Sequence, residues 1–96
     1  MLEIRITEEF KHWLETLKDL TGRAKIQARI KRLAEGNPGN TKHLGSKVSE
    51  MKIDFGPGYR IYYTQQEGMI YLLLIGGNKR SQAKDIQAAK LLIKNL

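Results

Sequence analysis

The chain lacks cysteine altogether and has only two prolines and two histidines among its 96 residues. Without cysteine no disulfide or thiolate metal ligand exists, and His12 and His43 have no acidic cluster at ligand spacing beside them, so a metal site is not expected. The longest apolar run, residues 69–75, is far shorter than the roughly 20 residues of a membrane span. Residues 1–5 lack the hydrophobic region of a signal peptide. We therefore expect a soluble cytoplasmic protein without membrane contact.

Acidic residues are also scarce. Ten Asp and Glu stand against seventeen Lys and Arg, which gives a formal net charge of +7 and a pI near 9.8. Such an excess on a small surface predicts a polyanionic or acidic partner. The length suggests one domain over residues 1–96 with a modest core that buries roughly 60–65% of the unfolded chain's surface.

The first third of the chain predicts a scaffold. Residues 2–6 alternate between apolar and polar and indicate a short strand. Thr7 is placed to cap a helix whose buried stripe has helical spacing: Phe10, Trp13, Leu14 and Leu17. The pair Thr21-Gly22 is expected to break this helix. A second helix should follow over residues 23–35, with Ile26, Ile30 and Leu33 turned inward.

The outer face of the second helix is strongly basic. We expect it to carry five cations with only Glu35 nearby: Arg23, Lys25, Arg29, Lys31 and Arg32. A run of this kind is often simply a solvated helix surface. The sequence leaves open whether these side chains are solvated or bind nucleic acid or an acidic partner.

The most informative stretch is residues 50–63, which reads as a hairpin around Gly56-Pro57-Gly58. Its alternation predicts one apolar face, with Met51 and Ile53, and one polar face. A short Gly-Pro-Gly turn predicts the following opposite pairs: Phe55 with Tyr59, Asp54 with Arg60, Lys52 with Tyr62, and Glu50 with Thr64. The polar face is either a solvated surface with ordinary ion pairs or a functional site.

The apolar run 69–75 predicts a central strand covered on both faces, and it ends in Gly76-Gly77. Lys79 and Arg80 follow, and Ser81 is a plausible cap for a final helix. A glycine-rich turn, two cations and a helix start suit a phosphate, although the spacing of a nucleotide-binding loop is absent. The inner face of the final helix is expected to hold Ile86, Ala89, Ile93 and Leu96. The predicted order β-α-α-β-β-β-α describes an α+β fold with a mostly antiparallel, twisted sheet covered by helices.

Residues 50–86 resemble a known family. The motifs are Phe-Gly-Pro-Gly-Tyr-Arg in the hairpin and Leu-Leu-Ile-Gly-Gly-Asn-Lys-Arg-Ser-Gln-Ala-Lys-Asp-Ile after it. Both are similar to those of the RelE/ParE superfamily of toxins, in particular the HigB-like addiction module killer proteins. The resemblance implies the toxin of a type II toxin-antitoxin system, with a RelE-like fold and a small helix-turn-helix antitoxin as partner.

The resemblance further implies an mRNA endonuclease that acts on ribosome-bound message. From the residues we expect it to use neither a metal nor a cofactor. Two alternatives remain: a ParE-like inhibitor that binds DNA gyrase without chemistry, and a non-toxic basic module that binds nucleic acid or the antitoxin. Cations grouped around a phosphate-sized site favour the endonuclease, because a gyrase binder does not need such a site.

RNA cleavage needs deprotonation of a ribose 2′-hydroxyl, stabilisation of a dianionic phosphorane and protonation of the leaving oxygen. Arg60 suits the second task, since a guanidinium holds two phosphate oxygens. Lys52, if crowded by other cations, could exchange protons near neutral pH, and Glu50 is the rival base. Lys79 completes the predicted catalytic group, while Arg80 and Tyr62 are expected to bind RNA. The resemblance carries over to Lys52 and Arg60.

One feature departs from the family pattern. Many relatives have a histidine or tyrosine near the C-terminus that transfers protons or stacks on a base. Here Gln82, Lys84 and Asp85 occupy the start of the final helix, and no aromatic residue follows Tyr71. No residue of this chain is assigned that role by resemblance.

Overall fold

The computed structural model describes residues 2–96. Within them the chain forms three helices and a five-stranded sheet. In chain order the elements are β1 (Glu3–Ile6), α1 (Glu8–Glu15), α2 (Leu20–Ala34), β2 (Thr41–Gly45), β3 (Val48–Ile53), β4 (Tyr59–Gln66), β5 (Ile70–Gly77) and α3 (Gln82–Lys94). The predicted α+β class is confirmed, and the residues around His43, expected to form a short strand or an irregular edge, form the additional strand β2.

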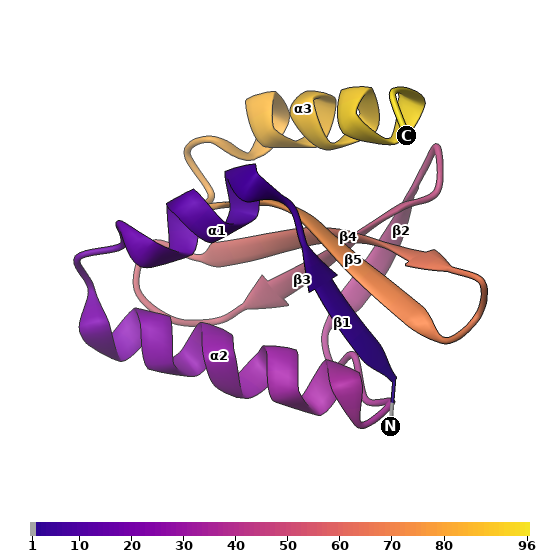
Figure 1. Cartoon of the computed structure of the whole chain (residues 1–96). Coiled ribbons are helices and arrows are strands. Elements are labelled where there is room, and N and C mark those ends of the chain that lie inside the picture. The colour runs from indigo at the N-terminus through magenta and orange to yellow at the C-terminus, as the bar shows by residue number, and fades with distance from the viewer. Residues whose placement is uncertain (1) are drawn as a thin grey trace.

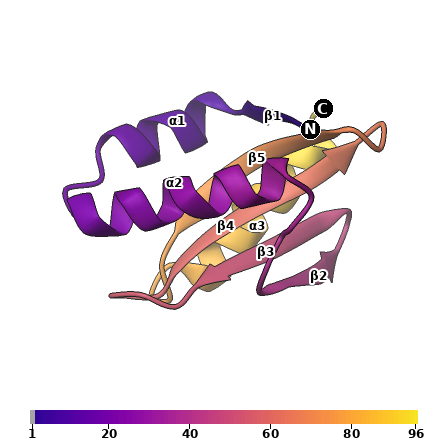
Figure 2. The same ribbon diagram turned by 90° about the horizontal axis from the view of Figure 1, so that it is seen from below.

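The strands are arranged in the order β1-β5-β4-β3-β2. Strand β1 runs parallel to β5, and the other three neighbouring pairs are antiparallel. Helices α1 and α2 lie against one face of the sheet, and α3 lies against the other (Figures 1 and 2). The sheet is therefore mostly antiparallel, as predicted, and β2 forms one of its two edges. In residues 2–96 no helix has the length and apolar character to cross a membrane.

The boundary between α1 and α2 differs from the prediction. Thr7 caps α1 as expected, with its side chain accepting from the Phe10 amide at 3.0 Å. Helix α1 ends before Thr16, however, and Gly22 lies inside α2, where the Asp19 carboxylate caps the helix by accepting from the Gly22 amide. A Cβ at Gly22 would come within 2.6 Å of Asp19 and Tyr59. Glycine is therefore needed here for close packing and not to end a helix.

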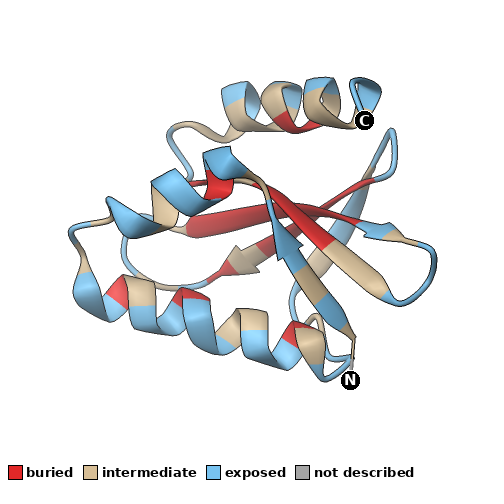
Figure 3. Cartoon of the chain, in the orientation of Figure 1, coloured by how far each residue is buried: buried red, intermediate tan, exposed pale blue. Residues whose placement is uncertain are grey.

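The larger core lies between the sheet and helices α1 and α2. It is built from the predicted inward residues of both helices and the apolar faces of the central strands: Phe10, Ile26, Leu33, Met51, Ile53, Tyr59, Ile61, Tyr63 and Leu73. Trp13, Leu14, Leu17 and Ile30 pack around them, so the predicted stripes are confirmed. The buried segments of the central strands stand out in red in Figure 3.

The opposite face of the sheet is also covered. A second apolar cluster lies beneath α3 and contains Val48, Tyr62, Leu72, Leu74 and Ala89. Glu50, Arg60 and Tyr62 on the polar face of the hairpin are therefore buried, whereas Asp54 near the turn is exposed. The expected inward position of Leu96 is wrong, because this residue lies after the end of α3 and is 70% exposed.

The hairpin register is shifted by two residues from the predicted one. Ile53 pairs with Tyr59, Lys52 with Arg60, and Glu50 with Tyr62. The reason is a longer turn, in which the Phe55 amide donates to the Ile53 carbonyl and the Gly58 amide to the Phe55 carbonyl. Because the shift is even, each side chain keeps its predicted face while its cross-strand partner changes.

Candidate active site

A pocket of about 240 Å³ opens at the β2 side of the sheet, beside the start of α3. Its lining residues come from four elements and the loop before β2: Asn40, Thr41, Lys42, Glu50, Lys52, Arg60 and Gln82. Three of the four predicted catalytic residues, Glu50, Lys52 and Arg60, meet here. Lys42 and Gln82 were not predicted, because only the sheet register and the placement of α3 bring them to Glu50.

Glu50 is the centre of this pocket and is only 3% exposed. Its Oε2 accepts from the side-chain amide of Gln82 at 2.9 Å and lies 4.0 Å from Nε of Arg60. The ammonium of Lys42, which faces Glu50 across the β2–β3 pair, lies 3.6 Å from Oε1. A buried carboxylate requires such partners to offset its lost hydration. Both oxygens are therefore engaged, which suits Glu50 for positioning its neighbours better than for accepting a proton.

Arg60 is 5% exposed and points along β4 toward the hairpin turn. Its Nη1 donates to the carbonyl of Gly58 at 2.6 Å, whereas its Nε is buried and has no hydrogen-bond partner among residues 2–96. A Cβ at Gly58 would lie 2.9 Å from this Nη1, so the glycine leaves room for the guanidinium. Because Nε faces the Glu50 carboxylate, what Arg60 brings to the pocket is the positive charge of its guanidinium.

Lys52 faces Arg60 directly across β3 and β4. Its ammonium lies 3.6 Å from Oδ1 of Asp54, whose side chain is 83% exposed. Asp54 was predicted to lie opposite Arg60, and this is wrong because of the register shift. Lys52 thus shares the pocket with the cations of Lys42 and Arg60, and its ammonium also forms a surface ion pair, which holds it only weakly.

Lys79 and Arg80 follow β5 and are exposed. The Lys79 amide donates to the Pro57 carbonyl at 3.3 Å, which fixes this turn beside the hairpin turn. Neither side chain lines the 240 Å³ pocket. The structure therefore places the Lys79 backbone close to the turn that Arg60 contacts, while both cations stay at the surface.

Tyr62 was expected on an accessible face and is instead completely buried beneath α3. Its hydroxyl has no hydrogen-bond partner within the described chain. Burial, and then the charge of Glu50, raise the pKa of Tyr62, so that the phenol stays protonated. Tyr62 is therefore out of reach of an RNA base in this structure, because α3 covers the strand on which it lies.

The five cations of α2 do not form one solvated face. Arg29 is half-buried and donates to the carbonyls of Lys52 and Pro38, both at 3.0 Å. Burial lowers the pKa of Arg29 from its very high ordinary value. Lys25 lies over the ring of Phe55 at 5.0 Å, while Lys31 and Arg32 are exposed. Arg29 thus joins α2 to β3 next to the pocket, and its predicted outward position is wrong.

Three comparisons place the chain among known proteins. The family described as "Phage derived protein Gp49-like" matches residues 12–95. A Haemophilus influenzae protein described as uncharacterized is 47% identical over 95 residues, which is 99% of this chain and 96% of that protein. A chain of the intact Escherichia coli RelBE toxin-antitoxin complex superimposes with a TM-score of 0.67 at 19% identity, covering 81% of this chain and 96% of that one. This last likeness establishes the RelE fold.

Proposed function

Because this chain belongs to the Gp49-like family of phage-derived proteins, a family of RelE/HigB-type toxins, we propose that it is the toxin of a type II toxin-antitoxin pair. We further propose that it is an endonuclease of mRNA, acting on ribosome-bound message. The observation that supports this activity is the pairing of Lys52 with Arg60 across β3 and β4, beside Glu50, in one small polar pocket.

The pocket suits a phosphodiester. At about 240 Å³ it is below the roughly 300–1,000 Å³ typical of small-molecule sites, which fits a phosphate and its ribose better than a whole cofactor. Lys42, Lys52 and Arg60 supply three cations against the single lining carboxylate of Glu50. The net positive lining attracts the dianionic phosphorane, in which negative charge exceeds that of the ground state.

We assign the roles as follows. Arg60 stabilises the phosphorane through the positive charge of its guanidinium, and Glu50, 4.0 Å from Nε, holds that group in place. Lys52 lies opposite Arg60, and its ammonium donates a proton to the leaving 5′-oxygen, while the proton of the 2′-hydroxyl passes to water. A bond forms between the 2′-oxygen and phosphorus while the bond to the 5′-oxygen breaks. The products are a 2′,3′-cyclic phosphate and a 5′-hydroxyl.

A second function has a specific observation in its favour. Glu50 and Arg60 are only 3% and 5% exposed and lie against each other, as in a structural ion pair. A ParE-like inhibitor that binds DNA gyrase, or a non-toxic basic module, would need no more than this. The endonuclease is preferred because three cations line the same pocket, which a structural pair does not require.

The proposed partner is an antitoxin, in line with the E. coli complex of similar fold. A groove of about 550 Å³ runs between the C-terminal half of α3 and the β2–β3 turn. Leu91, which is 58% exposed, lies in this groove with three lysines, Lys47, Lys90 and Lys94, and no carboxylate lines it. This chemistry fits an acidic amphipathic segment of the antitoxin, whose other part we propose to be a helix-turn-helix domain.

The experiment that tests the function compares two readouts after brief expression of the toxin. RNA 5′ ends are mapped across the transcriptome, and supercoiling by purified gyrase is measured with purified toxin. New 5′ ends that disappear with Arg60→Ala, together with unchanged supercoiling, are the expected result. Inhibited gyrase without new RNA ends would establish the binding-only alternative. Growth arrest with neither effect would refute both activities.

A further inference from the structure

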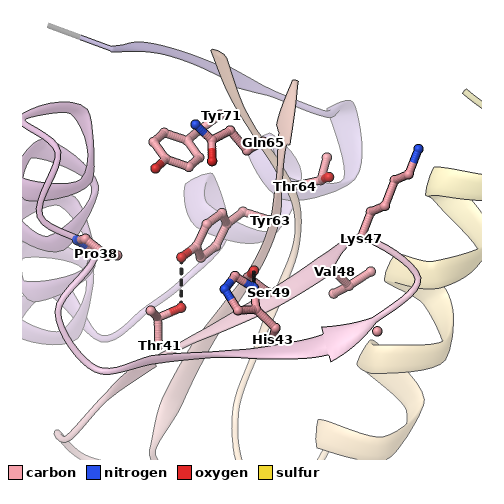
Figure 4. A pocket seen from close by; sticks show the side chains of 11 residues that line it. Pro38, Thr41, His43, Lys47, Val48, Ser49, Tyr63, Thr64, Gln65 and Tyr71 are labelled. Atoms are coloured by element: carbon pink, nitrogen blue, oxygen red, sulfur yellow. Dashed lines mark hydrogen bonds between the residues drawn. The ribbon is translucent and has the colours of Figure 1, made fainter. Parts of the chain in front are cut away.

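A second and larger pocket, of about 450 Å³, lies across β2, β3 and β4 next to the loop that follows α2 (Figure 4). Its polar side chains come mainly from four neighbouring strands, β2 to β5, and the proposed function does not use them. Successive residues of a strand face opposite sides. Ser49 and Tyr63 of this pocket therefore lie on the other side of the sheet from Glu50 and Tyr62.

The strand register builds the floor of this pocket. His43 pairs with Ser49, and Ser49 pairs with Tyr63, so the three side chains form a row across the sheet. Nδ1 of His43 lies 2.7 Å from the Ser49 hydroxyl. Thr41 donates to the Glu50 carbonyl at 3.0 Å, so the Tyr63 hydroxyl donates to Thr41 at 2.8 Å. These hydrogen bonds hold a set of ordered polar groups facing an open space.

The side chains that line this pocket indicate which class of ligand fits it. Among the described residues, the lining includes one lysine, Lys47, near the end opposite Pro38, and no carboxylate. Tyr71 is half-buried and forms another wall, with its ring edge-on to that of Tyr63 at 5.5 Å. Gln65, beside Tyr71 in Figure 4, adds an amide that both donates and accepts. An aromatic wall, polar groups and a single cation match a planar base attached to a phosphate and do not match a cation.

We propose that this pocket binds one unstacked nucleotide of single-stranded RNA, with the base against Tyr71 and the phosphate toward Lys47 and His43. The inference rests on the proposed function and extends it to a second nucleotide position. Thr41, on the edge strand β2, lines both pockets, which lie on opposite faces of the sheet and meet at this edge. An RNA strand that crosses β2 would reach both pockets. The volume of about 450 Å³ lies within the range of small-ligand sites.

The test uses binding without cleavage. A single-stranded RNA hexamer with 2′-O-methyl groups at every position cannot be cut, and its contacts are mapped by NMR on the backbone amides of the folded protein. We expect shifts at Thr41, His43, Ser49 and Gln65 in addition to those around Arg60. Tyr71→Leu, which keeps an apolar side chain in the core, should weaken binding about 5- to 150-fold, the range for one stacked base.

His43→Ala changes an exposed residue and serves as the second variant in case Tyr71→Leu fails to fold. It should weaken binding as well, whereas His12→Ala, at the other histidine, exposed on α1, should not. Shifts confined to the Arg60 pocket, with normal affinity in both variants, would overturn the subsite and leave the endonuclease intact. A pocket that responds to an extended peptide of the antitoxin and not to the RNA would also overturn it. No RNA binding at either pocket would instead count against the proposed function.

Discussion

Lys52 and Arg60 lie directly opposite each other on β3 and β4 and line one pocket. Like charges at opposite positions of a sheet normally repel. Each has a carboxylate of its own, however: Asp54 lies 3.6 Å from Lys52, and Glu50 lies 4.0 Å from Arg60. Glu50 is buried and held by several partners, whereas Asp54 is exposed and forms only a weak surface ion pair. Glu50 is thus the fixed anion of the pocket, while the ammonium of Lys52 is bound only weakly by Asp54.

Arg60→Ala should reduce single-turnover RNA cleavage about 10²- to 10³-fold, the scale for losing one preorganised electrostatic donor. It should also lower the free energy of unfolding by about 2 kcal/mol, because the hydrogen bond to Gly58 is lost and Glu50 keeps fewer partners. Cleavage is compared at a temperature where both proteins are folded, with the exposed Arg5→Ala as control. A rate within a factor of three of wild type would remove Arg60 from the mechanism.

Lys52→Ala should slow cleavage about 10²-fold if Lys52 transfers a proton. Lys52→Arg should then be equally slow, because a guanidinium does not release its proton near neutral pH. Asp54→Ala removes only the surface partner of Lys52, which contributes less than about 1 kcal/mol, and should leave the fold intact. Full activity of Lys52→Arg would show that Lys52 acts through charge alone.

Arg29 and its exposed neighbours on α2 should respond differently to substitution. Arg29→Ala removes two charge-assisted hydrogen bonds to the chain and should lower the free energy of unfolding by about 2–4 kcal/mol, measured by urea titration. Lys31→Ala with Arg32→Ala should change stability by less than about 0.5 kcal/mol.

The double variant Lys31→Ala with Arg32→Ala should weaken association with ribosomes in a salt-dependent way. Each lost phosphate contact should reduce by about 1 the steepness with which the logarithm of the binding constant falls with the logarithm of the salt concentration. Identical binding curves across a salt series would exclude a docking role for this end of α2. A stability loss in the double variant equal to that of Arg29→Ala would contradict the structural assignment of Arg29.

Asp19 should make stability depend on acid pH. Hydrogen bonds from the Gly22 amide and then from the Tyr59 hydroxyl lower the pKa of Asp19 in the folded protein. Asp19 therefore stabilises the fold at pH values above its unfolded-state pKa of about 4. This stabilisation is lost as the pH falls through the lower pKa of Asp19 in the folded protein. Asp19→Asn should therefore lower the free energy of unfolding at pH 7. The difference in this free energy between variant and wild type should shrink below about pH 4. Glu15→Gln, at an exposed residue of α1, provides the control. A difference that grows on acidification would contradict this sign.

The order of the three helices and of strands β1, β3, β4 and β5, and the two faces of the hairpin, were determined by the sequence. The alternation in residues 50–54 and 59–63 places Met51 and Ile61 on one face and Glu50 and Arg60 on the other. This separation is kept when the register shifts by an even number of residues. The helix stripes around Phe10 and Ile26 follow from spacing alone. These patterns are local, so neighbouring residues suffice to predict them. The N-cap at Thr7 is local in the same way.

Only the tertiary structure decided which groups meet. The length of the turn after Ile53 determines that Arg60 lies opposite Lys52. The sequence alternation cannot predict this, because it is the same in registers that differ by two residues. Helix α3 could lie on either face of the sheet as far as its own sequence shows, and its position buries Tyr62 and brings Gln82 to Glu50. Lys42 reaches the same carboxylate through the edge strand β2. Contacts between residues far apart in the chain depend on packing and register, and no local pattern records them.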